Sequence, residues 1–276
     1  MNDTPILATL PFPNIDPVLL SLGPLQIHWY GIAYVVGILF AWWYSRHLVL
    51  NNTLWGNKPA SIKPVDLDDF LTWAVFGIII GGRLGYVFFY DFAAFMRNPF
   101  SIIEVWNGGM SFHGGLLGVL VAMILFARRR GFSAFSLFDV IAASVPIGIM
   151  TGRIANFINA ELYGKTTDLP WAFIFPGAGP DPRHPSQLYE AVLEGLLMFI
   201  ILRLFTHSMH KLRQPGYIAG LFVLWYAFSR ILVEFVRLPD AQIGYLAGHW
   251  LTMGMILSIP LALVGLWAII TSGNRQ

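Results

Sequence analysis

The sequence predicts an all-α integral membrane protein, a bundle of about seven transmembrane helices with a small periplasmic cap. Of the 276 residues, 56% are hydrophobic and only 12% are charged, whereas soluble domains carry roughly 25% charged residues. The mean hydropathy is +0.63, and a soluble protein of this length has too little interior to bury so much apolar surface. The apolar residues also fall in runs of about 20, the length at which a helix crosses a bilayer.

Seven runs of this kind can be delimited along the chain. They cover about residues 21–45, 68–90, 112–127, 137–158, 188–206, 216–237 and 246–272. Short polar segments separate several of these runs, such as the three arginines at 128–130 and the segment RQPG at 213–216. We expect one polytopic domain over residues 1–276, without a cleavable signal peptide, because the first residues lack a basic segment and a small-residue cleavage site.

Lysine and arginine are distributed unequally between the two sets of loops that seven spans create. One set holds ten of them, namely Arg46, Lys58, Lys63, Arg128, Arg129, Arg130, Arg203, Lys211, Arg213 and Arg275. The other set holds three, namely Arg97, Lys165 and Arg183. Because cytoplasmic loops carry the excess of positive charge, we predict a periplasmic N-terminus and a cytoplasmic C-terminus. The Gly- and Pro-rich stretch Leu162–Pro185 then forms the periplasmic cap.

Three pairs of small residues four positions apart lie within the predicted spans. They are Gly81/Gly85, Gly114/Gly118 and Gly148/Gly152. Such pairs allow two membrane helices to approach closely, so we expect them to serve helix packing.

Four further arginines fall at the outer ends of predicted spans. They are Arg83, Arg153, Arg230 and Arg237. Charges at this depth are costly and tend to mark binding sites or pathways. The guanidinium fork stays charged and matches phosphate or carboxylate. A phosphate at the level of the headgroups is most simply that of a phospholipid, so we expect a lipid-phosphate site that opens outward.

The segment GRIANFINAELYG, residues 152–164, carries the densest group of polar residues in an apolar context. Arg153 and Asn156 are three residues apart and share a helix face. Asn159 and Glu161 fall where the helix should end, where they can turn inward and orient Arg153. A snorkelling arginine with interfacial capping groups is the alternative, but it accounts poorly for two amides and a carboxylate.

The sixth predicted span carries a polar face. Tyr226, Arg230, Glu234 and Arg237 follow at i, i+4, i+8 and i+11, which places them within about 80° of one another on a helix. The alternative is an ion-pair ladder along one helix that only stabilises the bundle. Both interpretations remain open at this point.

His113 begins the third span in the segment SFHGGLLG, at the same membrane level as the arginines. The glycines that follow, Gly114 and Gly115, leave the imidazole sterically open, and a histidine titrates near neutral pH. It is a candidate general base. An isolated buried histidine is, however, more often a structural hydrogen-bonding residue.

Weaker candidates lie near these groups. Tyr30 belongs to the segment HWYG, and Arg83 and Tyr86 share a face of the second span. Gln187 and Glu190 belong to HPSQLYE, at the entrance to the fifth span. Aromatic residues are common at any membrane interface, so each tyrosine alone is a weak indication.

Several kinds of site are excluded or unsupported by the sequence. The chain has no cysteine, which rules out disulfides, thiolate metal sites and a cysteine nucleophile. Motifs of zinc proteases, serine hydrolases and P-loop enzymes are absent. The segment HSMH at residues 207–210 has no carboxylate nearby in the sequence. We therefore expect no metal, no cofactor and no nucleic-acid partner.

GRIANFINAELYG resembles the signature of the bacterial phosphatidylglycerol–prolipoprotein diacylglyceryl transferases. HWYG, GGRLGYV, SFHGG, HPSQLYE and RILVEFVRLPDAQ follow in the family's order, over about residues 25–245. The resemblance implies a seven-span enzyme of the bacterial cytoplasmic (inner) membrane. It implies transfer of the diacylglyceryl group of phosphatidylglycerol to the lipobox cysteine of prolipoprotein signal peptides, with release of glycerol phosphate, the first step of lipoprotein maturation.

The resemblance also implies roles for individual residues. It puts lipid binding on Arg153 and Arg230, and proton removal on His113. It assigns the wall of the site to Tyr30, Asn156, Glu161, Gly164 and Tyr226. From the polar faces we add, as expected substrate-binding residues, Arg83, Tyr86, Gly114, Asn159, Glu234 and Arg237. Ala160 stands where the family signature commonly has glycine, and we expect no consequence from this difference.

Two other functions use the same residues. A transporter or scramblase of phospholipids or anions would employ the same arginines, but it would need a polar path to the cytoplasmic side. The inner halves of the predicted spans carry little beyond Ser229 and Glu194. An intramembrane hydrolase would use His113 on water.

Overall fold

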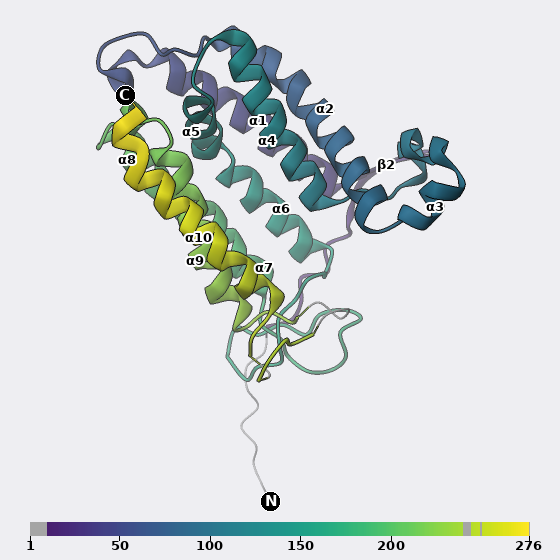
Figure 1. The fold of residues 1–276 in the computed structure, drawn as a ribbon. Helices are drawn as coiled ribbons and strands as arrows, with labels where there is room; N and C mark the ends of the chain where they lie inside the picture. Colours follow the sequence, from purple (N-terminus) through teal and green to yellow (C-terminus); the bar gives the residue numbers. More distant parts are fainter. Residues whose placement is uncertain (1–9, 240–243, 249, 276) are drawn as a thin grey trace, which may run out of the picture.

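The computed structural model describes residues 10–239, 244–248 and 250–275. Its long helices run side by side in a tilted bundle (Figure 1). The irregular segment between α6 and α7 lies at one end of this bundle, and a short arm that carries α3 projects from its side (Figure 1).

The α-helices are α1 (Trp29–Leu50), α2 (Pro64–Phe89), α3 (Phe92–Arg97), α4 (Phe112–Arg130), α5 (Ala134–Ser144), α6 (Pro146–Ile158), α7 (Ser186–Glu190), α8 (Met198–His207), α9 (Tyr217–Glu234) and α10 (Met253–Thr271). Short 3-10 helices are η1 (Asn52–Trp55), η2 (Pro99–Ile103), η3 (Val105–Asn107), η5 (Lys211–Arg213) and η6 (Ser272–Arg275), and η4 (Ala191–Leu197) is π-helical. Strands β1 (Val18–Leu22) and β2 (Leu25–His28) form an antiparallel hairpin.

Within the described residues, five helical segments are long and apolar enough to cross a membrane, namely α1, α2, α4, α9 and Met253–Arg275. Helices α5 and α6 add a sixth if they form one span with a 42° bend. The bend comes at Pro146, which lacks the N–H that a continuous helix requires. The prediction of an α-helical membrane protein is confirmed, while the total of seven spans stays a prediction.

Helix bounds differ from the predicted spans at three places. The first helix begins at Trp29 rather than near residue 21, because Gly23, at φ +61°, turns the preceding residues into the β1–β2 hairpin. The last helix begins at Met253, where the Thr252 hydroxyl caps the helix by accepting a hydrogen bond from the Met255 N–H at 3.3 Å. The residues of the fifth predicted span are divided among α7, η4 and α8, which follow one another without interruption.

Glycines set the contact between α2 and α4. A Cβ atom at Gly85 would lie 2.7 Å from the Cα atom of Gly114, and one at Gly77 would lie 2.8 Å from the carbonyl oxygen of Gly118. Side chains at these positions would force the two helices apart. The packing role predicted for the Gly114/Gly118 pair is therefore confirmed, and Gly114 serves a helix contact.

Asp139 of α5 connects two helices that are distant in the sequence. Its Oδ2 atom accepts a hydrogen bond from the Gly216 N–H at 2.7 Å, and its Oδ1 atom accepts one from the Ala219 N–H at 2.8 Å. Asp139 is fully buried. Its carboxylate thus satisfies the free N–H groups and the positive dipole end of α9.

The loops that the charge count assigns to one side lie together in space. Arg213 donates to the carbonyl oxygen of Thr53 at 2.8 Å, and Arg275 donates to that of Pro215 at 3.3 Å. Two loops and the C-terminal segment therefore meet at one end of the bundle.

Candidate functional site

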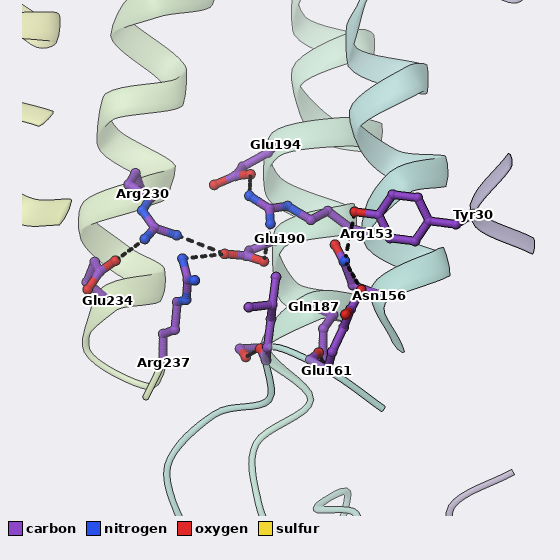
Figure 2. A network of polar contacts seen from close by, with 12 residues as sticks. Tyr30, Arg153, Asn156, Glu161, Gln187, Glu190, Glu194, Arg230, Glu234 and Arg237 are labelled. Atoms are coloured by element: carbon purple, nitrogen blue, oxygen red, sulfur yellow. Dashed lines mark hydrogen bonds and ion pairs between the residues drawn. The ribbon is translucent and has the colours of Figure 1, made fainter. Parts of the chain in front are cut away.

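A network of three arginines and three glutamates joins α6, α7, η4 and α9 (Figure 2). Its members are Arg153, Arg230, Arg237, Glu190, Glu194 and Glu234. The three glutamates are almost completely buried, at 0% exposure for Glu190 and Glu194 and 3% for Glu234. Buried charges are tolerated when they are paired, and here equal numbers of opposite charges meet.

Glu190 lies at the centre of this network (Figure 2). Its Oε2 atom is 3.2 Å from Arg153 Nη1. Its Oε1 atom is 3.0 Å from Arg230 Nη1 and 3.8 Å from Arg237 Nη1. One carboxylate thus holds guanidinium groups from α6 and from the end of α9 around a common point.

The remaining nitrogens of two of these arginines have carboxylate partners of their own. Arg153 Nη2 lies 3.1 Å from Glu194 Oε2, and Arg230 Nη2 pairs with Glu234 one turn later on α9. The ladder considered for the sixth span therefore includes the Arg230–Glu234 pair. The other glutamates come from α7 and η4, so the network crosses between helices and does more than compensate charges along one of them.

The local geometry of η4 brings its glutamate to α6. A Cβ atom at Gly195 would lie 2.9 Å from the Cα atom of Met150, so η4 packs directly against α6. Glu190 and Glu194 are four residues apart and face the same side. A π-helical turn within an otherwise regular helix is frequent at functional sites, and here it coincides with the buried carboxylates.

A second polar cluster adjoins the network and contains residues of the signature segment (Figure 2). Asn156 Nδ2 donates to the Tyr30 hydroxyl at 3.2 Å and to Glu161 Oε1 at 2.7 Å. Gln187 Nε2 donates to the carbonyl oxygen of Glu161 at 2.5 Å. The structure thus brings together Tyr30 of α1, Asn156 of α6 and Glu161 of the irregular segment between α6 and α7, which we call the irregular layer.

The backbone around Glu161 is held in an unusual conformation. Ala160 and Leu162 have φ values of +54° and +57°, in the left-handed region that costs an L-residue about 1–2 kcal/mol. Glycine adopts this conformation without that cost. The expectation that Ala160 has no consequence is therefore wrong, because this position carries backbone strain that glycine relieves.

Gly164 fixes the irregular layer to the end of α9. Its N–H donates to the carbonyl oxygen of His184 at 2.8 Å, and it forms a bridge with Arg237. A Cβ atom at Gly164 would lie 2.6 Å from the carbonyl oxygen of Val236. Only glycine allows this approach, which positions the segment beside Arg237.

Two further candidates on α6 and α9 have different surroundings. Asn159 ends α6, where its N–H donates to the carbonyl oxygen of Ala155 at 3.0 Å. Tyr226 lies one turn before Arg230 on α9, within electrostatic reach of Glu194, Arg230 and Arg153. Tyr226 therefore borders the network, while Asn159 contributes its backbone to the end of the helix.

Arg83 and Tyr86 lie at the base of the arm. Arg83 is 8% exposed and donates hydrogen bonds to four backbone carbonyl groups, those of Ser101, Ile102, Gly108 and Gly109. Tyr86 lies beneath the Arg83 guanidinium and stacks on Tyr90. The contacts of Arg83 thus hold the arm against α2, which is a structural task.

Among the described residues, no polar contact links His113 to the arginines of the network. Its side chain is exposed, packs against the ring of Phe112, and lines a groove of about 870 Å³ between α2 and α4. No hydrogen bond or ion pair among the described residues joins it to the network. Its assignment as a general base stays a prediction.

The centre of the network was not identified from the sequence. The sequence marks Glu190 and Gln187 only as polar residues at a span entrance, and Glu194 as one of few polar residues in the inner half of a span. The signal was present, because two carboxylates four residues apart within an apolar run are unusual. Within the part of the chain that the structure describes, no three His, Asp or Glu side chains are placed to hold a metal ion.

Comparison with known proteins finds relatives over nearly the whole chain. Residues 17–271 match the family model described as prolipoprotein diacylglyceryl transferase. A protein of Agrobacterium fabrum is 60% identical over 264 residues, which cover 96% of this chain and 94% of the relative. Proteins of Mesorhizobium japonicum and Brucella anthropi are 57% and 58% identical over 267 and 262 residues, covering 96% and 95% of this chain and 93% of each relative. All three relatives are named phosphatidylglycerol–prolipoprotein diacylglyceryl transferase.

Proposed function

Because this chain belongs to the prolipoprotein diacylglyceryl transferase family, we propose that it transfers the diacylglyceryl group of phosphatidylglycerol to a cysteine thiol of prolipoproteins. The observation that carries this proposal beyond the likeness of sequence is the pair Arg153 and Arg230, held 3.2 Å and 3.0 Å from the two oxygens of Glu190. Two guanidinium groups that one carboxylate holds close together are suited to bind a phosphodiester.

The reaction replaces one bond to the diacylglycerol carbon by another. The thiolate sulfur of the peptide attacks this carbon, the carbon–oxygen bond to phosphate breaks, and glycerol phosphate leaves with the electron pair. Charge develops on the leaving phosphate, where Arg153 and Arg230 stabilise it electrostatically. The nucleophile belongs to the substrate, so a chain without cysteine is compatible with this chemistry.

The thiol proton needs an acceptor, since a free thiol has a pKa near 8.5 and only the thiolate attacks. We assign this role to His113, whose imidazole is exposed at the end of the α2–α4 groove. This assignment requires the substrate thiol to reach the groove while the lipid phosphate contacts the arginines. Tyr30, Asn156 and Glu161 would form part of the wall of the site.

For the membrane arrangement we propose a multi-pass protein of the cytoplasmic membrane with a periplasmic N-terminus. The ten-to-three distribution of Lys and Arg between loops supports this orientation. The continuous helical run of α7, η4 and α8 would add a span to those already delimited. The arginine network and the irregular layer at Leu162–Pro185 would then face the periplasm, where prolipoprotein cysteines emerge.

Product identity tests the function. The purified protein is incubated with phosphatidylglycerol of labelled acyl chains and a lipobox peptide, and the peptide is analysed by mass spectrometry. We expect diacylglyceryl on the cysteine sulfur, and none on the matched peptide in which serine replaces that cysteine. Movement of lipid between the leaflets of a vesicle without any peptide modification would instead support the transporter.

A further inference from the structure

The arginines that would bind a lipid phosphate already face carboxylates. Arg153 has two of them, one at each terminal nitrogen, because Nη1 lies 3.2 Å from Glu190 and Nη2 lies 3.1 Å from Glu194. Both glutamates are fully buried. Both terminal nitrogens of Arg153 are therefore occupied, and one carboxylate must give way before a phosphate oxygen can take its place.

The carboxylates of the network are held unequally. Glu190 contacts three arginines. Glu234 pairs with Arg230 within its own helix and is packed against the backbone of Gly254. Glu194 has a single ion pair, and among the described residues its buried Oε1 atom has neither a hydrogen bond nor an ion pair. Glu190 Oε2 also accepts no hydrogen bond, but it lies 3.2 Å from Arg153 Nη1.

Incomplete pairing makes Glu194 the least stabilised of these buried charges. A buried carboxylate offsets its loss of hydration only when its oxygens are paired or hydrogen-bonded. One oxygen of Glu194 meets this condition and the other does not. Its release from Arg153 therefore costs less than the release of Glu190, which would free three guanidinium groups at once.

We propose that Glu194 is an internal counter-ion that the lipid phosphate displaces from Arg153 Nη2, while Glu190 stays in place and positions Arg153 and Arg230. This inference rests on the proposed function. A phosphodiester carries one negative charge, the same as a carboxylate, so the exchange leaves the charge facing Arg153 unchanged. Glu194 and Glu190 are positioning residues in this scheme, and neither touches the reacting atoms.

The displaced carboxyl group takes up a proton. In an interior of low dielectric constant, a second unpaired anion beside the bound phosphate is strongly disfavoured. The charged and titratable groups that face Glu194 are Arg153 of α6, Glu190 of α7, and Tyr226 and Arg230 of α9. When phosphate occupies Arg153, the pocket keeps its total charge only if one proton enters with each lipid. In this scheme Glu194 is an anion paired with Arg153 Nη2, at 3.1 Å, until the lipid binds.

Binding of phosphatidylglycerol without peptide tests this exchange, since no turnover occurs. The lipid is titrated into the purified protein in weakly buffered detergent, and both the dissociation constant and the proton uptake are measured. For wild type we expect about one proton bound per lipid, a value set by the charge balance. Glu194→Gln should bind the lipid roughly tenfold more tightly, since no anion then competes for Arg153 Nη2, and should take up no proton.

Glu234→Gln is the matched control. It removes one negative charge from the same network, but from Arg230 rather than from Arg153. If total charge alone set the affinity, both variants would bind more tightly and behave alike; the proposal requires that Glu234→Gln retain proton uptake. Glu190→Gln should weaken binding and lower kcat, because Arg153 and Arg230 lose their common partner.

Wild-type protein provides a second measurement that does not depend on any variant folding. A hydrophobic carbodiimide, which modifies protonated buried carboxyl groups, is added with and without phosphatidylglycerol, and the modified residues are identified by mass spectrometry. We expect the lipid to raise modification of Glu194 and to leave Glu190 unmodified, whereas diacylglycerol, which lacks phosphate, should change neither. Unchanged Glu194 modification, or weaker lipid binding by Glu194→Gln, would overturn the exchange even where thioether formation proceeds normally.

Discussion

Arg153 Nη1 of α6 lies 3.2 Å from Glu190 Oε2 of α7, in a contact between two segments separated by the whole irregular layer. The carboxylate is completely buried, and its other oxygen lies 3.0 Å from Arg230. One side chain that belongs to neither of their helices therefore contributes to the orientation of both arginines. Substitution of these side chains therefore tests whether the arrangement of the two guanidinium groups matters for activity.

Arg153→Ala and Arg230→Ala should each lower transfer by two to three orders of magnitude, the effect of removing one preorganised charge-stabilising group. Arg→Lys at either position should also be severely impaired, because an ammonium group cannot contact two partners as a planar fork does. Initial rates with phosphatidylglycerol and a lipobox peptide measure the effect. Arg97→Lys, on the exposed side of the arm, is the matched control and should remain near wild type. Near-normal turnover in a network lysine variant would contradict the bidentate role.

His113→Gln should lose most of its activity at pH 7 if His113 accepts the thiol proton. The loss should shrink as pH rises toward the thiol pKa of about 8.5, because thiolate then forms without a base. A pH–rate profile of the variant and of wild type, from about pH 6.5 to about pH 9, brackets that value. A deficit that is constant over this range would make His113 a structural residue.

Asp139→Ala should lower the thermal stability, because α9 loses the carboxylate that accepts its first N–H groups. The loss of a helix cap amounts to about 1–2 kcal/mol, and the buried N–H groups it leaves unpaired place this site at the upper end. The stability of Asp139→Asn should lie between that of wild type and that of Asp139→Ala, since the amide keeps one acceptor oxygen. Thermal unfolding in detergent measures both, with the exposed Asp168→Ala as control. Equal stability of all variants would remove the capping role.

Ala160→Gly should raise the unfolding temperature slightly. Relief of the left-handed strain at φ +54° contributes about 1–2 kcal/mol, and the greater freedom of glycine in the unfolded chain offsets about 0.4–1 kcal/mol of it. Ala160→Val should destabilise, because a β-branched residue tolerates this conformation least. If both variants are less stable than wild type, the strain is compensated by contacts of the alanine methyl group.

Single cysteines test the orientation in the membrane, since the chain has none of its own. Ser133→Cys lies in the loop after α4 that we predict to be cytoplasmic, and Asp168→Cys lies in the irregular layer that we predict to be periplasmic. Both residues are exposed. An impermeant maleimide applied to intact spheroplasts should label only the cysteine at position 168. Labelling at position 133 alone would reverse the orientation.

Composition and hydrophobic periodicity alone determined that this is a helical membrane protein, and they located most helices within a few residues. These are local properties, because a run of about 20 apolar residues must either span a membrane or be buried, whatever surrounds it. The same locality let Arg153 and Arg230 be recognised, because a charge within such a run is conspicuous wherever the helix packs.

Partners across helices were decided only by the tertiary structure. Spacing along α9 identified Glu234 as a partner of Arg230, but Glu190 and Glu194 reach Arg153 only because η4 packs against α6 at Gly195. A contact between segments depends on how faces of several helices fit, which no local pattern contains. For the same reason the sequence grouped Arg83 with the other arginines, whereas the folded arm surrounds it with backbone carbonyl groups.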